Sequence, residues 1–174
     1  SGNMTLAVNA LFMQLYLLYS HFMDGFAYAG EALVGKYAGA ADKHSLRRCV
    51  SHLFAWGWSL AAIFAFAYGV FNHEVMSLFS DKPEVVAFAA TYRWWIALAP
   101  IAGMAAFIWD GVFVGLTATR QMLLSLAGAT AVYFAIYFLY PFPDANSSLW
   151  TAFLTYLAVR GVILWLCFAR KNEY

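Results

Sequence analysis

The sequence predicts an all-α fold, a polytopic membrane bundle of about five transmembrane helices. Of its 174 residues, 64% are hydrophobic and 11% are charged, whereas soluble domains contain about 45–50% apolar and about 25% charged residues. Five apolar stretches reach the roughly 20 residues that a helix needs to cross a bilayer. The alternation of apolar and polar residues that is typical of membrane barrel strands is absent. The spans should therefore be helices.

The first span is expected within residues 5–37 and the second at about residues 49–71. The 33 residues of the first stretch would extend about 50 Å as a helix, against a hydrocarbon core of about 30 Å. This helix should therefore continue beyond the lipid. The polar connection GAADKHSLRR between the two spans contains Gly, Asp and Ser, which are typical of turns. Gly35 and Gly39 match a small-xxx-small pattern, which lets another helix approach closely.

The third span is expected within residues 85–116, the fourth at about 122–140 and the fifth at about 149–169. The third stretch is again longer than a bilayer requires. Pro100 should kink it, because proline removes a backbone donor and clashes with the preceding turn. The connections before these spans, NHEVMSLFSDKPE, TATRQ and PFPDANSS, are short and polar. We expect all five spans to form a single transmembrane domain over residues 1–174.

The basic residues predict the orientation of the bundle, because cytoplasmic connections carry an excess of Lys and Arg. If the helices alternate in direction, the first connection, the third connection and the C-terminal end lie on one side. The basic residues near that side are Lys36, Lys43, Arg47, Arg48, Arg120, Arg170 and Lys171. We therefore expect a multi-pass protein of the cytoplasmic (inner) membrane, with its C-terminus in the cytoplasm and its N-terminus outside.

Four ionisable residues within the expected spans are candidate functional residues: Asp24, Glu31, Asp110 and Arg160. An ionisable side chain inside the membrane marks a functional site by default. Asp24 and Glu31 are two helical turns apart and share a helix face. Tyr28 lies between them as a candidate residue for lining a cavity. The small residues around them should permit close approach by a neighbouring helix, and they are Gly25, Ala27 and Gly30.

These four side chains predict a site for a coupling ion. Counted from the basic residues, Asp24, Asp110 and Arg160 lie about 15–18 Å along their helices, and Glu31 lies nearer the cytoplasmic rim. If they converge, three carboxylates and one guanidinium carry a net charge of about −2, which a low dielectric penalises. At least one carboxylate should then hold a proton or coordinate a cation. Asp110, Asp24 and Glu31 are thus candidates for coupling to H⁺ or Na⁺, with Arg160 as a charge partner.

Simpler interpretations stay open. Asp24 with Arg160, or Asp110 with Arg160, could form a static pair that fixes the helix register, and Glu31 could be solvated at the membrane surface. His21 is close enough in sequence to join the Asp24 network, although structural packing is the better interpretation. The sequence contains no HExxH, GxSxG, P-loop or dinucleotide motif, and its histidines and cysteines show no metal-ligand spacing. We therefore expect no enzyme activity, no metal site, no cofactor other than the coupling ion, and no nucleic-acid partner.

Two segments resemble the multidrug and toxic compound extrusion (MATE) family of transporters. MDGFAYAGEALVGKYAGAAD resembles the end of the eighth helix and the loop that follows it. LFSDKPEVVAFAATYRWWIALAPIAGMAAFIWDGVFVGLTATRQM resembles the region from the ninth to the tenth helix, and DGVFVGLTATRQM is most similar to the DNA-damage-inducible (DinF-like) branch. The order and spacing of the two segments strengthen the resemblance.

The resemblance implies a twelve-helix transporter with two six-helix lobes, of which this chain would hold helices eight to twelve of the C-terminal lobe. Such a protein exports organic cations or amphipathic compounds by alternating access, in exchange for H⁺ or Na⁺. Its partners would be the lipid bilayer, drug-like substrates and the N-terminal lobe of the same transporter. By position, Asp110 matches an acidic residue that lines the cavity of the C-terminal lobe, and Asp24 and Glu31 match the eighth-helix motif.

One departure and one alternative function accompany the resemblance. The stretch GLTATRQ lacks a second acidic residue that many members carry there, which argues against a cation site built on that residue. The alternative function is a non-transporting membrane scaffold or assembly partner, in which the intramembrane charges hold helices together. Flux of a substrate through a reconstituted membrane separates the two interpretations.

Overall fold

The computed structural model describes residues 2–140 and 144–170, and these residues form seven helices and no strand. In chain order the helices are α1 (Gly2–Gly39), α2 (Lys43–Val70), α3 (Asn72–Phe79), α4 (Pro83–Thr91), α5 (Arg93–Gly115), α6 (Thr119–Leu139) and α7 (Ala145–Arg170). Five of them, α1, α2, α5, α6 and α7, are long and apolar enough to cross a membrane. The predicted all-α membrane bundle with about five spans is therefore confirmed.

The helix boundaries differ from the expected ones in two places. The stretch 85–116 is divided at Tyr92, whose backbone angles (φ −108°, ψ 9°) leave the helical region, so that α4 ends there and the spanning helix α5 begins at Arg93. The connection before it, expected to be short and polar, contains α3 and the start of α4. These two short helices bury Met76, Val85 and Val86 in an apolar cluster with the first turns of α1. Their burial explains why a polar connection folds into helices.

Helix α2 begins at Lys43 because Asp42 caps it. The Asp42 carboxylate accepts a hydrogen bond of 2.9 Å from the Ser45 backbone N–H, which satisfies one of the free donors of the first turn. Hydrogen bonds from the Ser45 side chain and backbone hold the pKa of Asp42 below its usual value. The helix therefore starts six residues before the apolar run at residue 49, on which the prediction relied.

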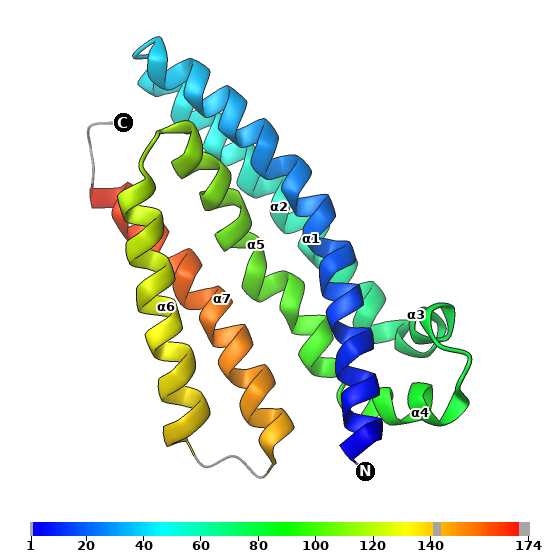
Figure 1. Ribbon diagram of the computed structural model, residues 1–174. Coiled ribbons are helices and arrows are strands. Elements are labelled where there is room, and N and C mark those ends of the chain that lie inside the picture. Colours follow the sequence, from blue (N-terminus) through cyan, green and yellow to red (C-terminus); the bar gives the residue numbers. More distant parts are fainter. Residues whose placement is uncertain (1, 141–143, 171–174) are drawn as a thin grey trace.

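Helix α5 is the centre of the bundle. In Figure 1, α1 and α2 lie on one side of it and α7 and α6 on the other, while α3 and α4 lie beside the N-terminal part of α1. Of the most apolar stretch of α5, 67% is buried, against 11% for α6. Polar side chains also join the helices: the Tyr19 hydroxyl donates to the carbonyl of Pro100 at 2.9 Å, and the Tyr68 hydroxyl donates to the carbonyl of Leu15 at 2.8 Å.

The two ends of the bundle differ in charge. The α1–α2 turn, the α5–α6 turn and the end of α7 lie at one end, and the start of α1, the α3–α4 pair, the end of α6 and the start of α7 lie at the other (Figure 1). The first end carries Lys36, Lys43, Arg47, Arg48, Arg120 and Arg170. Lys171, which also entered the orientation argument, lies outside the described residues. The structure thus gathers these basic residues at one end of the bundle.

Helices α1 and α5 approach each other closely at two glycines of α5. A Cβ atom added at Gly111 would lie 2.7 Å from the Cα atom of Ala27, and one added at Gly115 would lie 2.6 Å from the carbonyl oxygen of Glu31. Such contacts are possible only between backbones without a side chain between them. Gly35 also belongs to this interface, whereas a Cβ at Gly39 would meet no atom within 4 Å. The small-xxx-small pair that forms this helix contact is therefore Gly111 with Gly115, and not Gly35 with Gly39.

The substitution Gly111→Ala tests this contact. The added methyl group must push α1 and α5 apart, and overpacking of this kind typically costs about 1–3 kcal/mol of stability. The matched control is Gly25→Ala, because a Cβ there meets nothing within 4 Å and alanine favours the helix. Thermal unfolding in detergent, followed by circular dichroism, should show a lower midpoint for Gly111→Ala and an unchanged or higher one for Gly25→Ala. Equal midpoints for the two variants would contradict the contact.

Candidate functional site

An ion pair inside the bundle connects α5 to α7. The Arg160 Nη2 atom donates to the Asp110 Oδ1 atom at 2.8 Å, and the two side chains are only 21% and 25% exposed. Of the two pairings that the sequence left open, Asp110 with Arg160 is the one that the structure contains. No other ion pair within 4 Å occurs among the described residues of the chain. The guanidinium therefore neutralises Asp110 rather than Asp24.

Glycine contacts explain why these two side chains meet. Asp110 directly precedes Gly111, where α5 touches α1, and Arg160 directly precedes Gly161, where α7 approaches α5. A Cβ atom added at Gly161 would lie 2.9 Å from the Cβ atom of Ala105. At both positions a helix approaches α5 closely, so a side chain one residue away lies at the edge of an interface. The charged groups are thus held near the surface that α1, α5 and α7 share.

Asp24 belongs to the same cluster. Asp24 lies close enough to Asp110 for the two carboxylates to interact electrostatically, and Tyr16 lies near Asp24, Asp110 and Arg160. The Asp24 side chain is half-buried and forms no hydrogen bond or ion pair with the described part of the chain. When all groups are ionised, two carboxylates and one guanidinium leave a net charge of −1 in this cluster. We call Asp24, Asp110 and Arg160 the charged cluster.

Glu31 and Tyr28 lie outside the charged cluster. Both side chains are exposed, and that of Tyr28 is 69% exposed. The backbone of Glu31 packs against Gly115, but no contact brings its carboxylate to Asp110 or Arg160. Of the three carboxylates that were expected to converge, only those of Asp24 and Asp110 therefore lie together. Tyr28 and Glu31 continue the exposed face of α1 on which Asp24 lies, because residues three and four apart share a helix face.

Aromatic residues that the sequence did not single out surround the charged cluster. The ring of Tyr16 packs edge-on against Phe153 of α7, with ring centroids 5.1 Å apart. It also lies tilted against Phe107 of α5, with centroids 6.3 Å apart. A second tyrosine, Tyr156, lies on α7. It precedes Arg160 by one helical turn, which places the two on one face of α7. That spacing was visible in the sequence, whereas the position of Tyr16 depends on how α1 crosses α5.

One hydrogen-bond donor of Arg160 has no acceptor among the described residues. This donor is the Nε atom, which is buried. A buried donor without an acceptor typically costs about 1–3 kcal/mol, so the guanidinium is poised to take a further acceptor. A second carboxylate or a polar group of a bound molecule would satisfy this atom. Arg160 can therefore bind a second acceptor in addition to Asp110.

The histidines do not contribute to the charged cluster. His21 is exposed, and its Nδ1 atom lies 2.6 Å from the carbonyl oxygen of Leu17 on the same helix. Within the described ranges, no group of three or more His, Cys, Asp or Glu side chains could hold a metal ion. Cys49 and Cys167 are both free cysteines.

A double-mutant cycle measures how much the ion pair stabilises the fold. Arg160→Met leaves Asp110 without its partner, and we expect a loss of about 1–3 kcal/mol. This is less than the 3–5 kcal/mol typical of a fully buried pair, because both side chains keep some contact with solvent. The double variant Asp110→Leu/Arg160→Met should recover most of that stability. Thermal unfolding of all four proteins in detergent gives the coupling energy. A double variant whose loss equals the sum of the single losses would show that the two side chains do not interact.

Comparison with known proteins gives one family model and several curated relatives that match most of this chain. The sequence model of the MatE family matches residues 2–140. DNA damage-inducible protein F of Escherichia coli (strain K12) is 30% identical over 163 residues, which are 94% of this chain and 35% of that protein. Proteins DETOXIFICATION 45, chloroplastic, and DETOXIFICATION 43 of Arabidopsis thaliana are 22% and 24% identical over 92% of this chain, and over 29% and 31% of their own lengths. The chain thus spans about a third of the length of these relatives. No solved structure matches it.

Proposed function

Because this chain belongs to the MatE family, we propose that it is part of a cation-coupled multidrug efflux antiporter that exports organic cations or amphipathic compounds. The observation that carries the proposal is the charged cluster, with one net negative charge between three spanning helices. A charge left over in a low dielectric is costly and favours binding of a cation. The protein acts as a transporter and not as an enzyme in this proposal.

The charged cluster gives the proposed transporter a simple exchange reaction. A proton or Na⁺ at Asp24 or Asp110 brings the cluster to neutrality, and so does a cationic substrate in their place. The coupling ion and the substrate compete for this one site and cannot occupy it together. In this proposal, each of them binds more tightly to a different arrangement of the helices. Alternating access then follows from the difference in affinity between the two arrangements. Arg160 pairs with Asp110 in one arrangement and, through its Nε donor, can bind a second carboxylate in the other.

The surroundings of the charged cluster fit this proposal. Tyr16, Phe107 and Phe153 supply aromatic faces beside it, and aromatic rings attract organic cations. The exposed side chains of Tyr28 and Glu31 would then face a cavity completed by the rest of the transporter. In this arrangement the basic end of the bundle faces the cytoplasm, and the C-terminus lies in the cytoplasm. The remaining lobe of the same transporter is the main protein partner.

The substitution Asp110→Asn in the full-length protein tests the transport function. It removes the charge that Arg160 pairs with and keeps the size of the side chain, so we expect efflux to be lost while expression is kept. Accumulation of ethidium in cells without other drug exporters gives the readout. Asp81→Asn is the matched control, because Asp81 is exposed in the connection between α3 and α4. Wild-type efflux by Asp110→Asn would remove Asp110 from the mechanism.

A scaffold function is the second candidate, and the Asp110–Arg160 ion pair is the observation that favours it. A static pair between α5 and α7 would stabilise the bundle without moving any ion. Proteoliposomes separate the two functions. The full-length protein should move ethidium when a proton or Na⁺ gradient is imposed, and the gradient that drives the movement identifies the coupling ion. Absence of movement under both gradients would favour the scaffold.

A further inference from the structure

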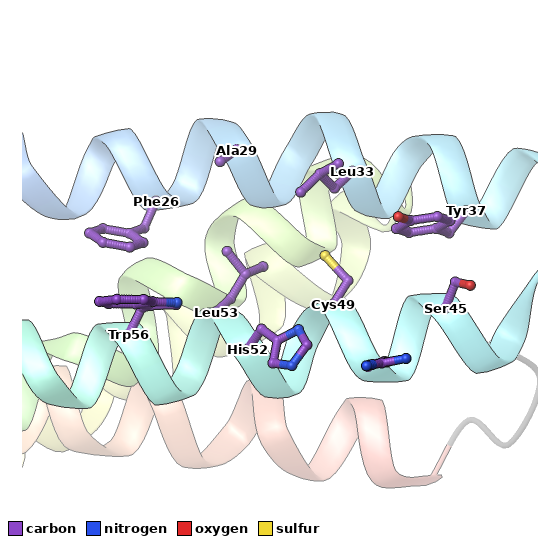
Figure 2. A pocket seen from close by; sticks show the side chains of 10 residues that line it. Phe26, Ala29, Leu33, Tyr37, Ser45, Cys49, His52, Leu53 and Trp56 are labelled. Carbon is purple, nitrogen blue, oxygen red and sulfur yellow. The ribbon is translucent and has the colours of Figure 1, made fainter.

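A groove between α1 and α2 lies apart from the charged cluster. It has a volume of about 520 Å³, within the range of about 300–1,000 Å³ that is usual for ligand sites. Figure 2 shows its lining side chains, which come from facing sides of the two antiparallel helices. It opens to the surface of the bundle, where the Trp56 side chain at its rim is 66% exposed.

The groove changes from polar to apolar along its length. Its polar end, next to the α1–α2 turn, is lined by Tyr37, Ser45 and Arg48, and His52 lies one helical turn further along α2, near the middle of the groove. The opposite end is lined by Phe26, Ala29, Leu53 and Trp56, and Phe26 lies over Trp56 in Figure 2. The polar end belongs to the end of the bundle where the basic residues gather. A ligand that fits both parts must be anionic at one end and apolar at the other.

The length of the groove matches one leaflet of a membrane. Tyr37 lies eleven positions after Phe26 on α1, and Trp56 lies eleven positions after Ser45 on α2. At 1.5 Å per residue this is about 17 Å, close to half of a hydrocarbon core of about 30 Å. A groove of this length that begins at the membrane surface would end near the middle of the bilayer.

The charges around the groove favour an anion. Arg48 is exposed and has no carboxylate within ion-pair distance among the described residues. No acidic residue lines the groove. Asp24 and Glu31 lie on the other side of α1, since helical periodicity turns them by about 140–180° from Phe26 and Leu33. The Arg48 guanidinium thus places a positive charge at the polar end of the groove, and no carboxylate of the described residues pairs with it.

We propose that this groove binds one anionic phospholipid, with its phosphate at Arg48 and His52 and an acyl chain along Phe26, Leu33 and Trp56. The phosphate supplies the acceptor that Arg48 lacks, and the acyl chain covers apolar surface between the two helices. This inference does not rest on the proposed transport function, since it needs only that the hairpin of α1 and α2 crosses a membrane.

Lipid binding to the purified, delipidated full-length protein tests the proposal. Native mass spectrometry should show one phosphatidylglycerol molecule bound more tightly than phosphatidylcholine. Arg48→Gln should weaken phosphatidylglycerol about fivefold, the effect expected of one basic residue at the membrane surface. Arg47→Gln is the matched control, because it removes the same charge from the turn but does not line the groove. Equal weakening by the two variants would overturn the site in favour of general surface attraction.

A second pair of variants tests the acyl-chain part of the groove. Ala29→Trp fills the groove and should reduce phosphatidylglycerol binding, whereas Ala32→Trp, at an exposed position that does not line it, should not. Glycerol 3-phosphate, which has the charge but no chain, should compete poorly. Unchanged binding by a folded Ala29→Trp protein, or effective competition by glycerol 3-phosphate, would overturn the lipid as the occupant. If Ala29→Trp does not fold, the two arginine variants still decide the question.

Discussion

The contact between the backbones of α1 and α5 is the constraint on which the rest of the structure depends. Gly111 and Gly115 let α5 lie directly against Ala27 and the backbone of Glu31. In lipid no hydrophobic effect drives two helices together, so close packing between small residues must do so. Because α5 is also the helix on which α2 and α7 pack, this contact sets the distance between the two sides of the bundle.

The charged cluster is a consequence of that packing. Asp110 is brought to α1 by its neighbour Gly111, and Arg160 is brought to α5 by its neighbour Gly161. Asp24 joins them because α1 crosses α5 a few residues away. The ion pair, the unpaired Nε donor and the leftover negative charge are thus properties of three helices together, not of any one helix. A small change in helix crossing would alter the balance of charges, which suits a protein proposed to alternate between two arrangements.

The sequence predicted the features that depend on composition and on spacing along one helix. The five long apolar helices, the place of Asp110 and Arg160 within two of them, and the gathering of basic residues at one end are of this kind. Features that depend on contacts between distant segments were not predictable. The sequence left two partners for Arg160 open, placed Glu31 with the other carboxylates, and gave no sign of Tyr16. The short helices α3 and α4 were also missed, because their few apolar residues are buried in a cluster with residues of α1, α2, α5 and α7 that are distant in the sequence.

The binding of a lipophilic cation to the full-length protein tests the central claim most directly. That claim is that α1, α5 and α7 hold one net negative charge, which a coupling ion and a cationic substrate neutralise in turn. Binding of tetraphenylphosphonium should weaken as the proton or Na⁺ concentration rises, and the substitutions Asp24→Asn and Asp110→Asn should both remove this competition. If both variants bind tetraphenylphosphonium like the wild type and respond to pH and Na⁺ in the same way, the charged cluster is not the coupling site.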